Sequence, residues 1–224
     1  MFDAHRHFDL SSGATSDALY ATSTLDEWQY AQQQPKKAVC SLGLLPSSPL
    51  IDPALLYERL VAFPHLQIGE VGLDRRFDDL ENQKQFLDAV LEIGYQLGRS
   101  VSLHCVRADG HLLDLLRSRK SRLPVMLWHG CTASSEVRTE AIRLGVLISY
   151  GPTLYRSNIA KDPHSLIAHP WVLESDWEGP EEEYMSTFNA HIKSFALLTG
   201  LSEESVVRNN DEKRAVLTNQ STPR

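Results

Sequence analysis

The chain has 224 residues with 42% hydrophobic and 23% charged positions, enough for one ordinary globular domain with a substantial core. Its 22 Lys and Arg against 29 Asp and Glu leave a net charge of −7, which disfavours a general nucleic-acid binder without excluding a phosphate-bearing substrate. No apolar run is long enough to span a membrane, the first ten residues lack an apolar signal-peptide core, and three cysteines favour a reduced, cytoplasmic protein over a disulfide framework.

Short apolar runs alternate along the chain with segments of helical periodicity. The apolar runs predict eight strands, near residues 1–4, 18–23, 38–44, 67–73, 100–106, 125–129, 146–149 and 171–174. A capping-box pattern at Thr24 and Glu27 opens a short helix. Further helices are predicted over 53–63, 80–97, 110–119, 134–144, 181–198 and 202–217.

This alternation of strands and helices indicates parallel strands, since each helix carries the chain back to the same edge of the sheet. Eight such strands predict an α/β fold, a single (β/α)8 TIM-type barrel domain over residues 1–224. The barrel is expected to be somewhat trimmed. Residues 8–17 are too few and too rich in Gly and Ser for a full helix, and residues 155–169 form a short connection. A doubly wound open sheet is the alternative.

Three polar side chains stand out in the first half of the chain. His5 and His7 close the first strand, and residues two apart in a strand point to the same side, so both rings can approach one cation. Glu70 lies inside an apolar strand, where a carboxylate is costly unless it is paired or bound to metal. Taken alone, the histidine pair is more typical of a protein surface, and the carboxylate equally fits a buried salt bridge.

Three later strands repeat this arrangement. His104 and His129 each end an apolar run, and Asp176 follows the last strand. In a barrel the carboxyl ends of all strands meet at one mouth, so four histidines and two carboxylates would converge there. These donors suit Zn²⁺ or a similar divalent ion, and six of them exceed the needs of one ion, which indicates two ions sharing a carboxylate.

The motifs that contain these residues resemble those of the TatD family of metal-dependent deoxyribonucleases, within the amidohydrolase-like barrel superfamily. The similar segments are HRHFD at 5–9, GEVGLD at 69–74, QKQF at 83–86, LHC at 103–105, WHG at 128–130 and LESD at 173–176. The resemblance implies that His5, His7 and Asp176 hold one ion (Zn, Mg or Mn). It implies that His104 and His129 hold a second, with Glu70 between them.

The chain also departs from the family pattern around the metal ligands. The family's G-x-H-P becomes Gly43-Leu-Leu-Pro46, which lacks the histidine. The family's E-T-D-A-P becomes Glu174-Ser-Asp-Trp-Glu178, so that Trp177 replaces a small residue. The metal ligands are therefore all present, whereas the walls of the substrate site are altered. Trp177 is expected either to stack on a base or sugar or to close the rim of the barrel.

The leading hypothesis is hydrolysis of a phosphodiester, with DNA or a small phosphoester as substrate. A bound cation would lower the pKa of its water to about 7, and Asp176 would accept the proton. Arg75 and Arg107 directly follow ligand strands and are the favoured phosphate contacts. Asp9 and Asp74 are expected to orient metal-bound histidines as hydrogen-bond acceptors, although Asp74 equally fits a helix N-cap.

Two alternatives remain. The same metal site would also serve hydrolysis of a small amide, lactone or phosphomonoester. A barrel that has lost turnover and acts as a binding protein is the third hypothesis, and the presence of all six ligand types argues against it.

Overall fold

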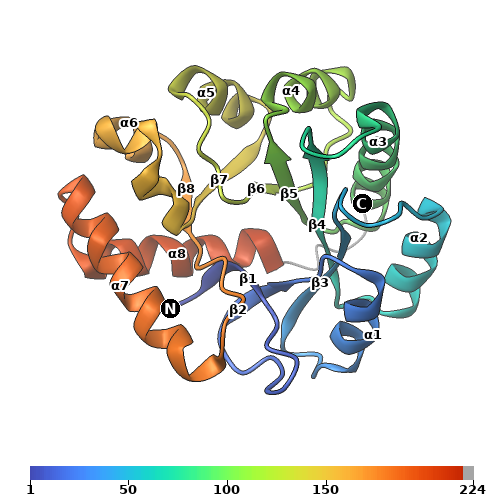
Figure 1. Cartoon of the computed structure of the whole chain (residues 1–224), viewed down its shortest axis with the longest axis horizontal. Coiled ribbons are helices and arrows are strands. Elements are labelled where there is room, and N and C mark those ends of the chain that lie inside the picture. Colours follow the sequence, from blue (N-terminus) through green and yellow to red (C-terminus); the bar gives the residue numbers. More distant parts are fainter. Residues whose placement is uncertain (219–224) are drawn as a thin grey trace.

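The computed structural model describes residues 1–218 and confirms the (β/α)8 barrel. Eight parallel strands pair in sequential order, and the helices surround them (Figure 1). The strands are β1 Asp3–His7, β2 Ala18–Ala21, β3 Val39–Leu44, β4 Gln67–Asp74, β5 Val101–Val106, β6 Met126–Trp128, β7 Val146–Tyr150 and β8 Trp171–Leu173. The sequential strand order excludes the doubly wound alternative, in which the order reverses at a switch point.

The helices follow the predicted pattern closely. They are α1 Leu25–Gln33, α2 Pro53–Ala62, α3 Leu80–Leu97, α4 Asp109–Ser118, α5 Ser135–Arg143, α6 Pro163–Ile167, α7 Glu181–Thr199 and α8 Glu203–Thr218. Gly98 ends α3 with a φ of 64°, a left-handed conformation that glycine adopts without a steric penalty. No helix among residues 1–218 combines the length and the apolar character needed to cross a membrane.

The two segments expected to be irregular differ from full helices in distinct ways. Residues 8–17 form turns and bends between β1 and β2. Residues 152–167 form two 3-10 helices, Pro152–Arg156 and Asn158–Lys161, followed by the short α6. The predicted first strand at residues 1–4 was misplaced, since β1 runs to His7. The polar residues at the end of β1 belong to the strand because the interior of the barrel is polar near its mouth.

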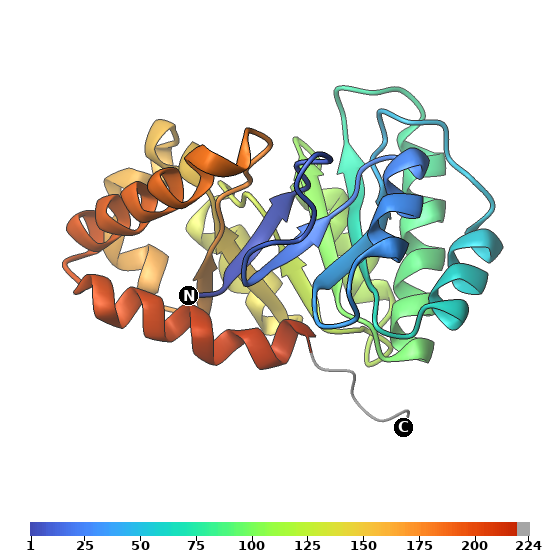
Figure 2. The same ribbon diagram turned by 90° about the horizontal axis from the view of Figure 1, so that it is seen from below.

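The barrel interior changes from apolar to polar along the strands. The end at which the strands begin is filled by Phe2, Ala4, Leu19, Leu127, Leu147, Val172 and Leu217, the last from α8. Figure 2 shows α8 lying across this end of the barrel. Because side chains two apart share a face, Leu127 lies on the same side as His129 at the other end. The apolar plug thus leaves the carboxyl ends of the strands for polar side chains.

The seam between β1 and β8 is closed by groups outside the regular ladder. At the mouth, Asp176 N donates to His5 O at 3.0 Å and His7 N donates to Trp177 O at 3.0 Å. Farther from the mouth, Asn210 of α8 bonds Leu173, the last residue of β8, and Phe2, which directly precedes β1. Its Oδ1 accepts from Leu173 N at 2.9 Å, and its Nδ2 donates to Phe2 O at 3.0 Å and to Leu173 O at 2.8 Å.

We expect Asn210→Ala to destabilise the fold by roughly 2–4 kcal/mol, because it leaves a buried N–H and two carbonyls without partners. Urea denaturation followed by circular dichroism measures the loss. Asn209→Ala is the matched control, since Asn209 is half-buried and donates a single bond to Trp171 O at 2.8 Å. Equal losses for the two variants would contradict the sealing role of Asn210.

Candidate metal centre

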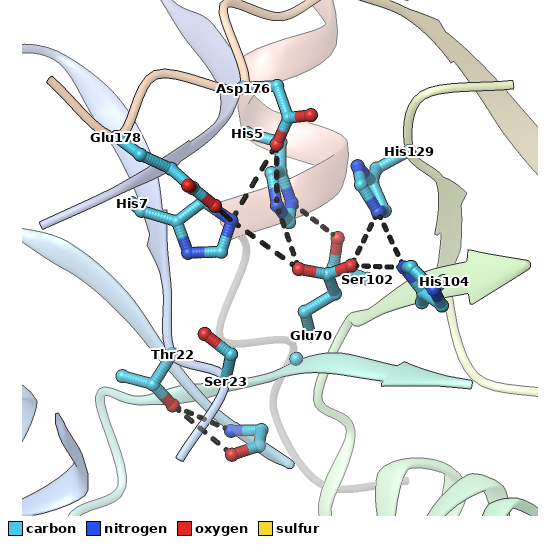
Figure 3. A network of polar contacts seen from close by, with 12 residues as sticks. His5, His7, Thr22, Ser23, Glu70, Ser102, His104, His129, Asp176 and Glu178 are labelled. Atoms are coloured by element: carbon cyan, nitrogen blue, oxygen red, sulfur yellow. Dashed lines mark hydrogen bonds and ion pairs between the residues drawn. The ribbon is translucent and has the colours of Figure 1, made fainter. Parts of the chain in front are cut away.

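Six side chains that are distant in the sequence meet at the carboxyl ends of the strands (Figure 3). His5 and His7 lie on β1, Glu70 on β4 and His104 on β5, while His129 follows β6 and Asp176 follows β8. All six residues expected from the sequence are therefore brought together. The side chains of His5 and Glu70 are almost completely shielded from solvent, whereas that of Asp176 is one-third exposed at the mouth.

Glu70 occupies the centre of this cluster and offers one carboxylate oxygen to each of two histidine pairs. Its Oε1 lies 2.5 Å from His104 Nδ1 and 2.6 Å from His129 Nε2. Its Oε2 lies 3.4 Å from His7 Nε2 and 3.6 Å from His5 Nε2. Each carboxylate oxygen of Glu70 thus faces its own pair of histidines, an arrangement in which one carboxylate could serve two cations.

Asp176 completes one side of the cluster. Its Oδ1 lies 3.6 Å from His7 Nε2 and 3.9 Å from His5 Nε2. The backbone bonds across the barrel seam hold it there, and its φ of 50° turns the chain away from β8. An aspartate tolerates this left-handed conformation better than most residues.

The second ring nitrogens of His5 and His129 face polar side chains. His5 Nδ1 lies 2.8 Å from Ser102 Oγ, and His129 Nδ1 lies 3.4 Å from Glu174 Oε1. Sequence analysis missed Ser102 and Glu174. A usable signal exists for Ser102, because it lies two residues before His104 on β5 and so shares its face of the strand. Glu174 lies directly after β8, outside the strand, so this signal does not extend to it. Such partners fix which nitrogen of a histidine is free to bind a metal.

Asp74 and Asp9 were both expected to orient histidines, and the structure separates them. Asp74 Oδ2 lies 3.1 Å from His104 Nε2, and Arg76 holds the same carboxylate from the other side. Asp79, not Asp74, caps α3. For Asp9 the expectation was wrong. Its carboxylate accepts from Ser11 and from the backbone N of Glu181, because hydrogen bonds within its own loop compete successfully.

The cluster fits a divalent metal by its donors and by buried polar atoms that have no hydrogen-bond partner, among them His5 Nε2. Potential donor atoms form three groups, and the atoms within each group lie within 4.8 Å of one another. The groups are His5, His129 and Asp176; His5, His7 and Glu70; and Glu70, His104 and His129. His5 Nε2 is buried and makes no hydrogen bond, although it faces two carboxylates. Buried polar atoms are normally satisfied, and imidazole with carboxylate is a donor set that divalent metals accept.

The charges in the cluster are strongly coupled. Burial opposes the ionised form of Glu70, but the nearby His129 and His104 hold the pKa of Glu70 well below its usual value. Burial also opposes the charged form of His7, yet Asp176 and Glu70 raise the pKa of His7 to about 10. The pKa of His129 is likewise raised well above its usual value by Glu70 and Glu174 against the effect of burial. These directions favour charged rings of His7 and His129 beside the carboxylates in the absence of metal.

The expected phosphate contacts lie on one part of the rim. Arg75 and Arg107 are exposed directly after β4 and β5, and Arg75 N donates to Val106 O at 3.1 Å, which joins the two segments. Arg6, between the two histidines of β1, points away from the site. It is buried, pairs with Glu181 at 2.7 Å, and stacks on Tyr184 with its Cζ 3.7 Å from the ring centre.

The loop after β8 carries two further side chains at the mouth. Trp177 Nε1 donates to Pro180 O at 3.1 Å, so the indole is bonded to its own loop at the rim of the barrel. Glu178 Oε1 lies 3.8 Å from His7 Nε2. Glu178 and Glu182 also line a hollow beside residues 8–11, which gives this part of the rim an acidic wall.

Comparisons with known proteins identify a family and a fold for the chain. The family model described as TatD related DNase matches residues 12–212. The 3'-5' ssDNA/RNA exonuclease TatD of Edwardsiella piscicida is 33% identical over 100 residues, a stretch that covers 44% of this chain and 36% of that protein. The alignment thus spans about a third of the length of this curated relative.

Two solved structures share the fold over nearly their whole length. The crystal structure of a TatD homologue from Escherichia coli K12 has a TM-score of 0.80 at 19% identity and covers 97% of each chain. A TatD family hydrolase from Entamoeba histolytica has a TM-score of 0.68 at 14% identity and covers 99% of this chain and 98% of that chain. At these identities the likeness concerns the fold.

We expect metal binding to release protons even near pH 8, where a histidine of ordinary pKa is already neutral. With its pKa raised to about 10, His7 stays protonated until a metal displaces the proton, so affinity should keep rising with pH above 7. Calorimetric titration of metal-free protein with Zn²⁺, in two buffers of different ionisation enthalpy, counts the protons. His7→Asn should release fewer. No release from the wild type would contradict the charge assignment.

Proposed function

The chain belongs to the TatD-related DNase family, and on this premise we propose that it is a divalent-metal-dependent hydrolase of phosphodiester bonds in DNA or in a small phosphoester. The observation that carries the proposal is Glu70, whose two oxygens face two separate pairs of histidines. A centre with two cations and a shared carboxylate suits in-line displacement at phosphorus, because both the attacking and the leaving oxygen can be stabilised.

We assign His5, His7 and Asp176 to one ion and His104 and His129 to the other, with Glu70 shared. Two groups of donor atoms support this division, since Glu70 occurs with the β1 histidines in one and with His104 and His129 in the other. The third group joins Asp176 to both His5 and His129, so we assign Asp176 by its distance of 3.6 Å from His7 Nε2. Zn, Mg and Mn all accept such ligands, and the four imidazoles favour Zn.

When bound, the cations would supply a water of lowered pKa and positive charge beside the phosphoryl oxygens. The chain's own groups would do the rest. Asp176 remains ionised, because His7 and His129 lower the pKa of its carboxyl despite its burial, and its second oxygen can take a proton. Ser102, Asp74 and Glu174 hold the histidine rings in place. Arg75 and Arg107 would bind the phosphate backbone or a terminal phosphate.

Glu70→Ala tests the proposal directly. We expect the wild type to carry near-stoichiometric divalent metal and to cleave single-stranded DNA or a generic phosphodiester, and the variant to lose both metal and activity. Elemental analysis and a hydrolysis assay measure the two effects. Glu58→Ala, on an exposed position of α2, is the control and should change neither. Absence of metal from the wild type after reconstitution would refute the ligand assignment.

The two rim arginines should act on binding more than on chemistry. We expect Arg75→Ala and Arg107→Ala each to raise KM roughly fivefold with kcat little changed, because an exposed charge contact is worth about 1 kcal/mol. Steady-state kinetics at low ionic strength measure the effect, and Arg143→Ala on the exposed surface of α5 is the control. A fall in kcat alone would contradict a binding role.

The acidic wall favours a second candidate, hydrolysis of a small amide, lactone or phosphomonoester at the same metal centre. Glu178 and Glu182 would repel a polyanionic strand crossing that side of the mouth but would not hinder a small substrate. Metal-loaded protein that hydrolyses such substrates and leaves DNA intact would favour this candidate.

We also propose a reducing compartment, the cytoplasm, for the chain. All three cysteines are free thiols. Burial raises the pKa of both Cys40 and Cys131 to about 12, so neither carries a reactive thiolate at neutral pH.

A further inference from the structure

Glu178 reaches into the metal centre from a part of the rim where the family motif provides no carboxylate. It lies in the loop between β8 and α7, with its side chain 76% exposed. Figure 3 nevertheless shows its carboxylate directed at the ring of His7, and Oε1 lies 3.8 Å from His7 Nε2. Asp176 Oδ1 is hardly closer to the same nitrogen, at 3.6 Å.

The loop itself holds Glu178 in this position. The residue before it, Trp177, accepts a hydrogen bond through its backbone O from His7 N at 3.0 Å, so the loop is fastened to the strand that carries His7. On the other side, the indole of Trp177 donates to Pro180 O and covers Gly179, where a Cβ would lie 2.4 Å from the indole ring. The turn is therefore held on both sides of Glu178, and Glu178 is the residue of this turn that faces the site.

No other cation accounts for this orientation. Within residues 1–218, the contact with His7 is the one ion pair that Glu178 forms. Three carboxylates, Glu70, Asp176 and Glu178, thus surround a single imidazole nitrogen. A divalent cation beside this nitrogen would attract all three carboxylates. The buried and unpartnered His5 Nε2 marks the same place as a cation site.

We propose that Glu178 is a displaceable ligand of the ion held by His5, His7 and Asp176, and that an anionic substrate oxygen must replace it. The inference rests on the proposed two-ion centre. The long, exposed side chain can swing out without disturbing the core, unlike the buried Glu70. Glu178 thereby raises the affinity for this ion in the resting protein and weakens the binding of phosphate groups, which selects for substrates that bring a strong anionic ligand.

The test is calorimetric titration of the metal-free full-length chain with Mn²⁺, followed by titration of the Mn²⁺-loaded protein with inorganic phosphate. Glu178→Gln should lower the affinity for one of two ions about tenfold and leave the other unchanged. It should also bind phosphate several-fold more tightly than the wild type. Glu178→Asp keeps the charge but shortens the reach by one methylene, and it should lose Mn²⁺ affinity as well.

Glu182→Gln is the matched control, because Glu182 lines the same acidic wall and forms no ion pair with a histidine among the described residues. It should bind both ions and phosphate as the wild type does. Equal losses in Glu178→Gln and Glu182→Gln would show a long-range effect of surface charge and overturn the ligand role. Unchanged Mn²⁺ binding in Glu178→Gln would overturn it too, with the two-ion centre intact. A wild type that binds no Mn²⁺ would overturn both proposals.

Discussion

Glu70 places a negative charge where water cannot solvate it, since its side chain is only 3% exposed. An isolated carboxylate there would cost several kcal/mol, and the chain offsets it with four imidazoles and no lysine or arginine. The difference matters because an imidazole can give up its proton and bind a metal ion as a neutral ligand, whereas a guanidinium would hold its charge permanently. The surroundings of Glu70 therefore favour exchangeable cations.

The position of the ligands around Glu70 depends in turn on the seam of the barrel. β1 supplies two histidines and the segment after β8 supplies Asp176, residues about 170 positions apart that only barrel closure can unite. The strand ladder does not continue across this seam, so backbone bonds to His5 and His7 at the mouth and the amide of Asn210 farther from it join the strands. Because the segment after β8 is bonded to β1 through Asp176 and Trp177, the next residue, Glu178, lies at the edge of the site.

The sequence predicts most of this arrangement because the signals are local. Apolar runs that end in His104 and His129 mark both a strand and the end of it that faces the mouth, and barrel geometry then brings the ends together. The sequence fails where partners come from the tertiary structure. Ser102 and Glu174 look like ordinary polar residues until the interior of the barrel is known to be polar at that depth. Asp9 was expected to orient a histidine as Asp74 does, but its carboxylate accepts a hydrogen bond from Ser11 in its own loop.

The charge of the rim is distributed unevenly, and this constrains how a ligand can lie in the mouth. In a barrel with sequential strand order, β4 and β5 lie across from β8 and β1. The segments that carry Arg75 and Arg107 therefore lie across the mouth from the loop that carries Glu178. An anionic group is attracted on the arginine side and repelled on the other, so a phosphoester would orient with its additional phosphates over β4 and β5. The net charge of −7 is thus compatible with a phosphate-bearing substrate, because the local field at the binding end, not the sum over the chain, governs recognition.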